Sequence, residues 1–210
     1  MIASTTITSD STQSLSMVKA DALRRAIGEA VVGLKIPVEL KSRLSAGCHS
    51  AALQNHAGIA VLFSLGLHAP AFALLRPAFE SYVRGIWLSD CAKQVEISDF
   101  ATGAWQKVPS MGNMVDQLES TASFGTGILT QSFSSNWETL CGFTHSGIEQ
   151  VQMHISGGDI ESNCSPEQID EALNFAGACA VMAGIAMATL ADDLEAAKRI
   201  RNIAREFAEG

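Results

Sequence analysis

The chain has 210 residues, enough to bury one sizeable hydrophobic core, and we expect one domain rather than two. Hydrophobic residues make up 47% of it and charged residues 17%, a soluble globular composition at its apolar end that leaves room for a buried subunit interface. The formal net charge of −8 argues against a broad nucleic-acid-binding surface and leaves only a local basic patch open.

The N-terminal residues 1–15 are rich in Ser and Thr, and we expect them to form a disordered tail ahead of a single helical domain at 16–210. They contain no basic segment followed by an apolar one, so no secretory signal is expected. Five cysteines are scattered without a CxxC pair. An odd number without regular spacing predicts reduced thiols in a cytoplasmic protein.

The first part of the chain predicts three helices in succession. Apolar positions recur at helical spacing over 16–34. Pro37 suits the first turn of a second helix, which ends near Leu65. Gly66 separates that helix from the apolar run Leu67–Leu88, which we expect to be the central helix of the fold.

The central helix carries charges in an unusual place. Arg76, Glu80 and Arg84 follow one another at four-residue spacing, which puts all three on one narrow stripe. Charges on a buried helix are costly unless they are paired, so the stripe is either a structural ion-pair lock or a site. Pro77 is expected to kink the helix beside Arg76, and a kink frees backbone carbonyl groups.

Beyond residue 90 the pattern predicts shorter elements. Two helices are expected at 97–106 and 111–121, with Ser110 capping the second. The sequence Ser135–Glu138 has capping-box spacing and would begin the next helix. A polar turn region at 154–164 is expected to follow.

The clearest local signal begins the last helix. Ser165 is a capping residue, Pro166 suits the first position and Gln168 the third, so a helix is predicted from here to about Phe207. Its segment Ala172–Ala191 has the length of a membrane span. Because Ala and Gly dominate it, we favour a buried helix and expect no membrane association.

No strand pattern competes with these helices. Runs that alternate apolar and polar residues are missing, and β-branched residues are sparse. The sequence therefore predicts an all-α fold, an antiparallel helical bundle with long second, third and last helices.

Metal and nucleotide motifs are missing from the sequence. His49 and His56 share a helix face, but no Asp or Glu joins them at the spacing of a metal site. Neither a P-loop nor a dinucleotide fingerprint is present. We expect no metal and no cofactor.

His145 is the best candidate partner for the charged stripe. It is predicted to lie in the C-terminal turn of its helix, where the helix dipole favours its cationic form. It can accept a hydrogen bond from an arginine or pair with Glu80. The candidate site therefore comprises Arg76, Glu80, Arg84 and His145, and the simpler alternative is a network that fixes helix register.

Two stretches carry a family resemblance. The segment ALLRPAFESYVRGIWL and the later WETLCGFTHSG resemble a group of uncharacterised bacterial helical proteins with ALLRPxFExYVRGxWL and THxG elements. That group is distantly similar to the HEPN superfamily of helical bundles. HEPN proteins are often dimeric and are often found in toxin–antitoxin and phage-defence systems.

Active HEPN ribonucleases, by this resemblance, use an arginine and a histidine with four to six residues between them, placed across a dimer cleft. The pair promotes attack of the RNA 2′-OH on its own phosphate. Arg43 and His49 match that spacing but lie in the helix before the core motif. His145 has no arginine at the corresponding distance before it.

Two functional hypotheses follow. The first is a HEPN-like protein that acts through homodimerisation or through binding an antitoxin or defence protein. The second is a metal-independent endoribonuclease whose site combines Arg76, Glu80, Arg84 and His145, with RNA as the partner. The acidic charge and the misplaced arginine–histidine pair favour the first. The Gly/Ala-rich last helix suggests close packing in a homodimer.

Overall fold

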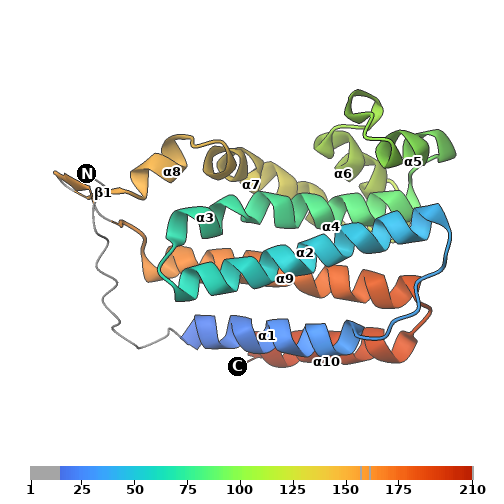
Figure 1. The fold of residues 1–210 in the computed structure, drawn as a ribbon, viewed down its shortest axis with the longest axis horizontal. Helices are drawn as coiled ribbons and strands as arrows, with labels where there is room; N and C mark the ends of the chain where they lie inside the picture. Colours follow the sequence, from blue (N-terminus) through green and yellow to red (C-terminus); the bar gives the residue numbers. More distant parts are fainter. Residues whose placement is uncertain (1–14, 157, 161, 210) are drawn as a thin grey trace.

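The computed structural model describes residues 15–156, 158–160 and 162–209 (Figure 1). The predicted tail therefore lies outside the described residues apart from Leu15, with which α1 begins. The elements, in chain order, are α1 Leu15–Val31, α2 Leu40–Ser64, α3 His68–Ala73, α4 Leu75–Asp90, α5 Gln94–Ala101, the 3-10 helix η1 Trp105–Lys107, α6 Met111–Glu119, α7 Ile128–Thr144, α8 Ile148–Gln152, β1 Ile155–Ser156, β2 Asp159–Ile160, α9 Pro166–Leu190 and α10 Leu194–Glu209.

The fold is predominantly helical, which confirms the all-α class. The long helices α1, α2, α4, α9 and α10 lie side by side along the long axis of the molecule (Figure 1). Helices that follow one another pack antiparallel, but α9 runs parallel to α1 and α4. The reason is that α5 to α8 lead the chain back to the end of the bundle where α4 begins.

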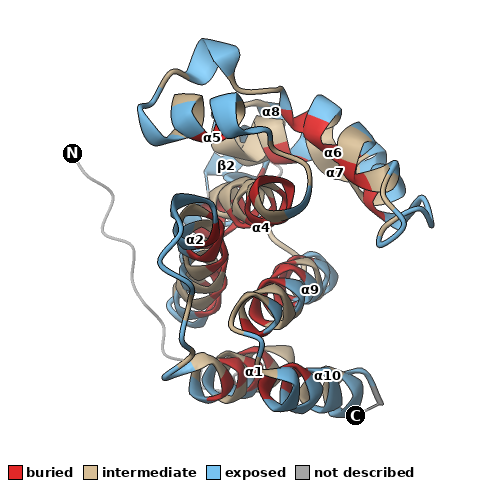
Figure 2. Ribbon diagram, turned by 90° about the vertical axis from the view of Figure 1, so that its right-hand side faces the viewer, coloured by how far each residue is buried: buried red, intermediate tan, exposed pale blue. Residues whose placement is uncertain are grey.

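The core lies around α4, whose residues from Tyr82 to Leu88 are buried apart from Arg84. The main apolar cluster joins α4 to α2, α6 and α9. A second, smaller cluster joins α1 to α9 and α10 on the far side of the bundle (Figure 2). Because α9 contributes to both clusters, it holds the two layers together.

The small residues of α9 are used inside the chain. A Cβ on Gly177 would lie 3.1 Å from Leu23, and one on Gly184 would lie 3.0 Å from Ile27. These glycines therefore let α1 approach α9, and they leave no glycine-lined face for a second copy. By length and hydropathy alone α9 could cross a membrane, and 44% of that apolar window is buried within the bundle.

The expected kink in the central helix occurs as a break one turn earlier. The run predicted as a single helix is divided into α3 and α4 at Leu74. Pro77 then lies in the first turn of α4, where its missing N–H leaves no intrahelical bond unmade. The proline thus terminates α3 rather than bending one continuous helix.

Two helix starts were predicted correctly from capping residues. The Ser110 hydroxyl accepts from the Asn113 N–H at the start of α6. At the start of α9, Ser165 and Gln168 form the reciprocal capping box. The energetic value of such a cap is about 1 kcal/mol.

The structure differs from the sequence prediction at three other helix boundaries. Ser135 lies inside α7 instead of beginning it, since the helix already begins at Ile128 after a left-handed Gly127. The predicted last helix is divided into α9 and α10 at Asp192, which has a positive φ of 54°. The helix predicted at 97–106 ends at Ala101, and a separate 3-10 turn follows.

The polar region at 154–164 holds one element that the sequence did not predict. Strands β1 and β2 form a two-stranded antiparallel sheet in which Ile155 pairs with Ile160. Each strand has two residues, too few for an alternating pattern to be detected.

Candidate functional site

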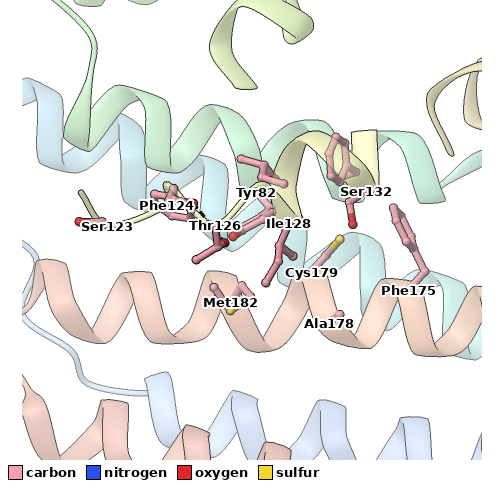
Figure 3. A pocket seen from close by; sticks show the side chains of 12 residues that line it. Tyr82, Ser123, Phe124, Thr126, Ile128, Ser132, Phe175, Ala178, Cys179 and Met182 are labelled. Atoms are coloured by element: carbon pink, nitrogen blue, oxygen red, sulfur yellow. Dashed lines mark hydrogen bonds between the residues drawn. The ribbon is translucent and has the colours of Figure 1, made fainter. Parts of the chain in front are cut away.

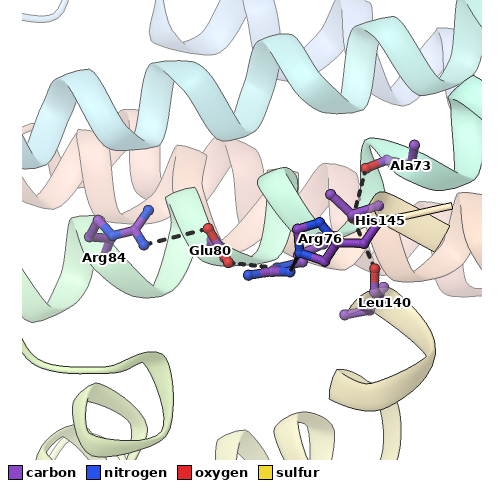
Figure 4. A network of polar contacts seen from close by, with 7 residues as sticks. Ala73, Arg76, Glu80, Arg84, Leu140 and His145 are labelled. Atoms are coloured by element: carbon purple, nitrogen blue, oxygen red, sulfur yellow. Dashed lines mark hydrogen bonds and ion pairs between the residues drawn. The ribbon is translucent and has the colours of Figure 1, made fainter. Parts of the chain in front are cut away.

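The charged side chains of the α4 stripe form ion pairs with one another. Arg76 Nε donates to Glu80 Oε1 at 2.8 Å, and Arg84 Nη2 donates to Glu80 Oε2 at 3.4 Å (Figure 4). The three side chains are each about one-fifth exposed. One carboxylate therefore serves two guanidinium groups in a half-buried setting, where a lone charge would be costly.

Each arginine also stacks on a tryptophan from a later element. The Arg76 guanidinium carbon lies 4.7 Å from the ring centroid of Trp137 on α7, and that of Arg84 lies 5.6 Å from the ring of Trp105 in η1. Cation–π contacts of this kind contribute about 0.5–2 kcal/mol. They connect α4 to two segments that are remote in the sequence.

His145 completes the cluster. It is the C-terminal capping residue of α7, as the sequence predicted, and its Nε2 lies 2.5 Å from Arg76 Nη1. A guanidinium only donates, so Nε2 is the acceptor in this hydrogen bond. This is the arginine contact anticipated from the sequence, whereas Glu80 is bound to the two arginines.

Thr144 fixes the position of His145 relative to α4. Its hydroxyl donates to the Ala73 carbonyl at 3.3 Å and to the Leu140 carbonyl at 2.9 Å. The Ala73 carbonyl is the one that Pro77, four residues later, cannot bond. The proline therefore frees an acceptor to which the end of α7 is tied (Figure 4).

The structure thus brings together all four residues predicted as the candidate site, Arg76, Glu80, Arg84 and His145. It does not bring together Arg43 and His49. Arg43 is exposed, whereas His49 is fully buried against the Gly85 backbone. A catalytic pair in α2 is therefore excluded by the orientation of the two side chains.

The roles of Trp105 and Trp137 were not predicted from the sequence. Trp137 precedes Thr144 by two helical turns, so its place on the same face of α7 was available from spacing. Trp105 offered no comparable signal, because it reaches Arg84 only through the turn between α5 and α6.

The buried histidines of α2 lie outside this cluster. His49 and His56 are 0% and 1% exposed, and desolvation lowers the pKa of each to about 4. Neither His49 ring nitrogen has a hydrogen-bond partner among the described residues. No group of three or more His, Cys, Asp or Glu side chains in the described ranges could hold a metal ion.

The cysteines are free thiols in this structure. Burial raises the pKa of Cys48 to about 11, although the nearby Arg84 lowers it, and burial raises the pKa of Cys179 to about 12. A nucleophilic cysteine needs a lowered pKa. These two thiols are therefore packing residues.

These features define an all-helical protein with an arginine–glutamate–arginine ladder stacked on two tryptophans and closed by a histidine. The chain belongs to a family of unknown function (DUF6988), which matches residues 49–210. This agrees with the uncharacterised family expected from the sequence, and the match includes the whole cluster. No curated protein and no solved structure matches the chain.

Proposed function

We propose that this chain is a HEPN-like cytoplasmic protein that acts by binding other protein chains, first of all a second copy of itself. The docking surface would be the Arg/Trp face, which we define as Arg76, Arg84, Trp105, Trp137 and His145. The observation that carries the proposal is the pair of arginines, each held against a tryptophan on one side of α4.

The chemistry of this face suits an interface. Trp and Arg are the residue types most enriched among the few positions that contribute most of the binding energy. Trp105 is 57% exposed, so an apolar ring is available to a partner. Because Glu80 already orders both guanidinium groups, binding would cost little side-chain entropy.

The same geometry disfavours catalysis as the main role. An arginine that stabilises a phosphate must offer its charge and its donors, whereas Arg76 is paired with the Glu80 carboxylate and uses two of its five N–H donors on Glu80 and His145. The net charge of −8 also opposes RNA binding. The resemblance to HEPN proteins supports a toxin–antitoxin or phage-defence setting, with an antitoxin or defence protein as the further partner.

Light scattering after gel filtration tests the proposal. At micromolar concentration we expect the wild type to have twice the 22.2 kDa mass of the chain. The substitution Trp105→Ser should give a monomer that remains folded, because that ring is largely exposed. Leu194→Ser removes an equally exposed apolar side chain from α10 and should leave the dimer intact. A monomeric wild type would refute self-association.

One observation favours a second candidate function, the metal-independent endoribonuclease. The acceptor nitrogen of His145 lies against Arg76 at the protein surface, so a base and a phosphate-binding cation are adjacent. In this mechanism His145 would take the proton of the RNA 2′-OH as its oxygen attacks the adjacent phosphorus. The 5′-oxygen would leave with a proton from water, His145 would afterwards return its proton to the solvent, and Arg76 would stabilise the phosphorane charge.

Incubation of the protein with single-stranded RNA and a chelator tests this second function. The ribonuclease hypothesis requires cleavage that His145→Ala abolishes while the melting temperature hardly changes. Under the proposed binding function, wild type and variant leave the RNA equally intact. Loss of fold in His145→Ala would instead show that the cluster holds α7 to α4.

A further inference from the structure

A pocket of about 370 Å³ lies between α4, the start of α7 and α9 (Figure 3). No residue of the Arg/Trp face lines it, so it is a separate feature of the molecule. Its volume is at the lower end of the range for small-molecule sites and corresponds to about twelve water-sized groups.

The walls of the pocket are apolar and aromatic. The Phe79 and Phe175 rings stack at a centroid distance of 5.9 Å, and Phe124 and Leu129 complete the walls. All lining side chains are uncharged. A charged ligand group would therefore lose its hydration without gaining a partner, which selects for an uncharged ligand.

The least exposed hydroxyl that lines the pocket is that of Tyr82. Tyr82 is only 6% exposed, and its hydroxyl makes no hydrogen bond within the described part of the chain. Burial, with a smaller contribution from Cys179, raises the pKa of Tyr82 above its usual value, so the hydroxyl keeps its proton and can donate. The hydroxyl oxygen is not among the fully buried polar atoms without a partner, so a ligand acceptor would take its hydrogen bond in place of water.

The exposed lining residues of the pocket are both apolar and polar. Ile128 and Met182 are 68% and 40% exposed, and Ser123 and Thr126 are exposed as well. The adjacent segment is held by Glu119, whose carboxylate accepts from the Gly127, Leu129 and Thr130 N–H groups. The pocket therefore has an anchored rim and an entrance of mixed polarity.

We propose that this pocket binds a small uncharged molecule, aromatic or aliphatic, with one hydrogen-bond acceptor placed on the Tyr82 hydroxyl. The stacked Phe79 and Phe175 rings hold the apolar body of the ligand, and the rim at Phe124 covers it. The inference does not depend on the Arg/Trp face or on dimerisation.

Fluorine NMR titration of the full chain tests the proposal with two matched probes. 4′-Fluoroacetophenone carries one carbonyl acceptor and no charge, whereas fluorobenzene has the ring without the acceptor. We expect wild-type protein to broaden both signals and to bind the ketone about fivefold more tightly, the value of one hydrogen bond. Tyr82→Phe should remove that difference and leave fluorobenzene binding unchanged.

A second variant fills the pocket from an exposed position. Ala178 lines the pocket, and Ala178→Trp should weaken both probes by roughly tenfold or more. Thr189→Phe adds a similar bulk at an exposed position on the same helix, away from the pocket, and should bind as the wild type does. Circular dichroism melting confirms that each variant is folded.

Three results would overturn the proposal. The first is a wild type that broadens neither probe, and the second is an Ala178→Trp variant that binds both probes normally. In the third result, neither protein binds a probe and the Ala178→Trp variant has half the mass of the wild type. That result would assign the face that carries the pocket to a second copy of the chain. Equal affinity of wild type and Tyr82→Phe for the ketone would refute the role of the hydroxyl.

Discussion

Acidification should destabilise this fold through the two buried histidines of α2. His49 and His56 have a pKa of about 4 in the folded chain, against an ordinary value of 6.5. Between pH 6.5 and pH 4 the unfolded chain binds the extra protons and the folded chain does not. Stability is therefore fully present above pH 6.5 and is lost as the pH falls toward 4.

The magnitude follows from the pKa difference. Each histidine contributes a slope of about 1.4 kcal/mol per pH unit within this interval, which sums to roughly 3 kcal/mol for one residue. For His56 the desolvation is reinforced by the charge of Arg24. The two residues together would remove a large part of the 5–15 kcal/mol that stabilises a typical domain.

Urea unfolding at a series of pH values measures this slope, with tryptophan fluorescence as the signal. His49→Leu should lower the slope between pH 6.5 and 4.5 by about 1.4 kcal/mol per unit. A change in packing moves the whole curve without changing its slope, so the comparison isolates the titration. A variant with the wild-type slope would refute the assignment of His49 as a buried neutral histidine.

Three further changes probe the site and its supports. Glu80→Gln should lower the free energy of unfolding by about 2 kcal/mol because two half-buried guanidinium groups lose their carboxylate. As a control, Glu195→Gln at the exposed pair with Lys198 should lower it by less than about 0.5 kcal/mol. Equal effects of the two substitutions would contradict the stabilising role of the stripe. Thr144→Val should lower the free energy of unfolding, measured by thermal melting, by about 1 kcal/mol because the Ala73 carbonyl at the end of α3 loses its hydrogen bond. An unchanged melting temperature would contradict a stabilising role for that bond. Glu119→Ala should speed amide hydrogen exchange at the start of α7, and unchanged protection there would contradict its anchoring role.

The features predicted correctly from the sequence depend on residues that are close together in the chain. Ser110 and Ser165 cap the helices they were expected to cap because capping depends on residues three positions apart. The stripe of α4 was predictable for the same reason, since four-residue spacing alone sets its geometry. The sequence predicted that Pro77 would leave a backbone carbonyl group free. It did not predict that this carbonyl would be bonded by a side chain at the end of α7.

The sequence alone could not predict which of several local signals would begin or end a helix. Ser135 has capping-box spacing, yet α7 begins earlier because Gly127 and the carboxylate of Glu119 satisfy the first N–H groups there. The division after α9 depends on Asp193, whose carboxylate accepts from the Ala196 N–H in a segment with strong helix propensity throughout. Contacts between remote segments, such as Trp105 on Arg84, had no signal in spacing.

The small-residue pattern of α9 has a use within the chain that the sequence did not predict. Its glycines and alanines suggested a packing face for a second copy of the chain. In the structure Gly177 and Gly184 instead accommodate α1 and α10. A homodimer therefore stays a prediction, and its proposed interface is now the Arg/Trp face instead of α9.

The mass of the wild-type protein in solution, compared with that of Trp105→Ser, tests the central proposal most directly. We expect a mass of twice 22.2 kDa for the wild type and a folded monomer of 22.2 kDa for the variant. A wild type that is monomeric and cleaves RNA through His145 would contradict it.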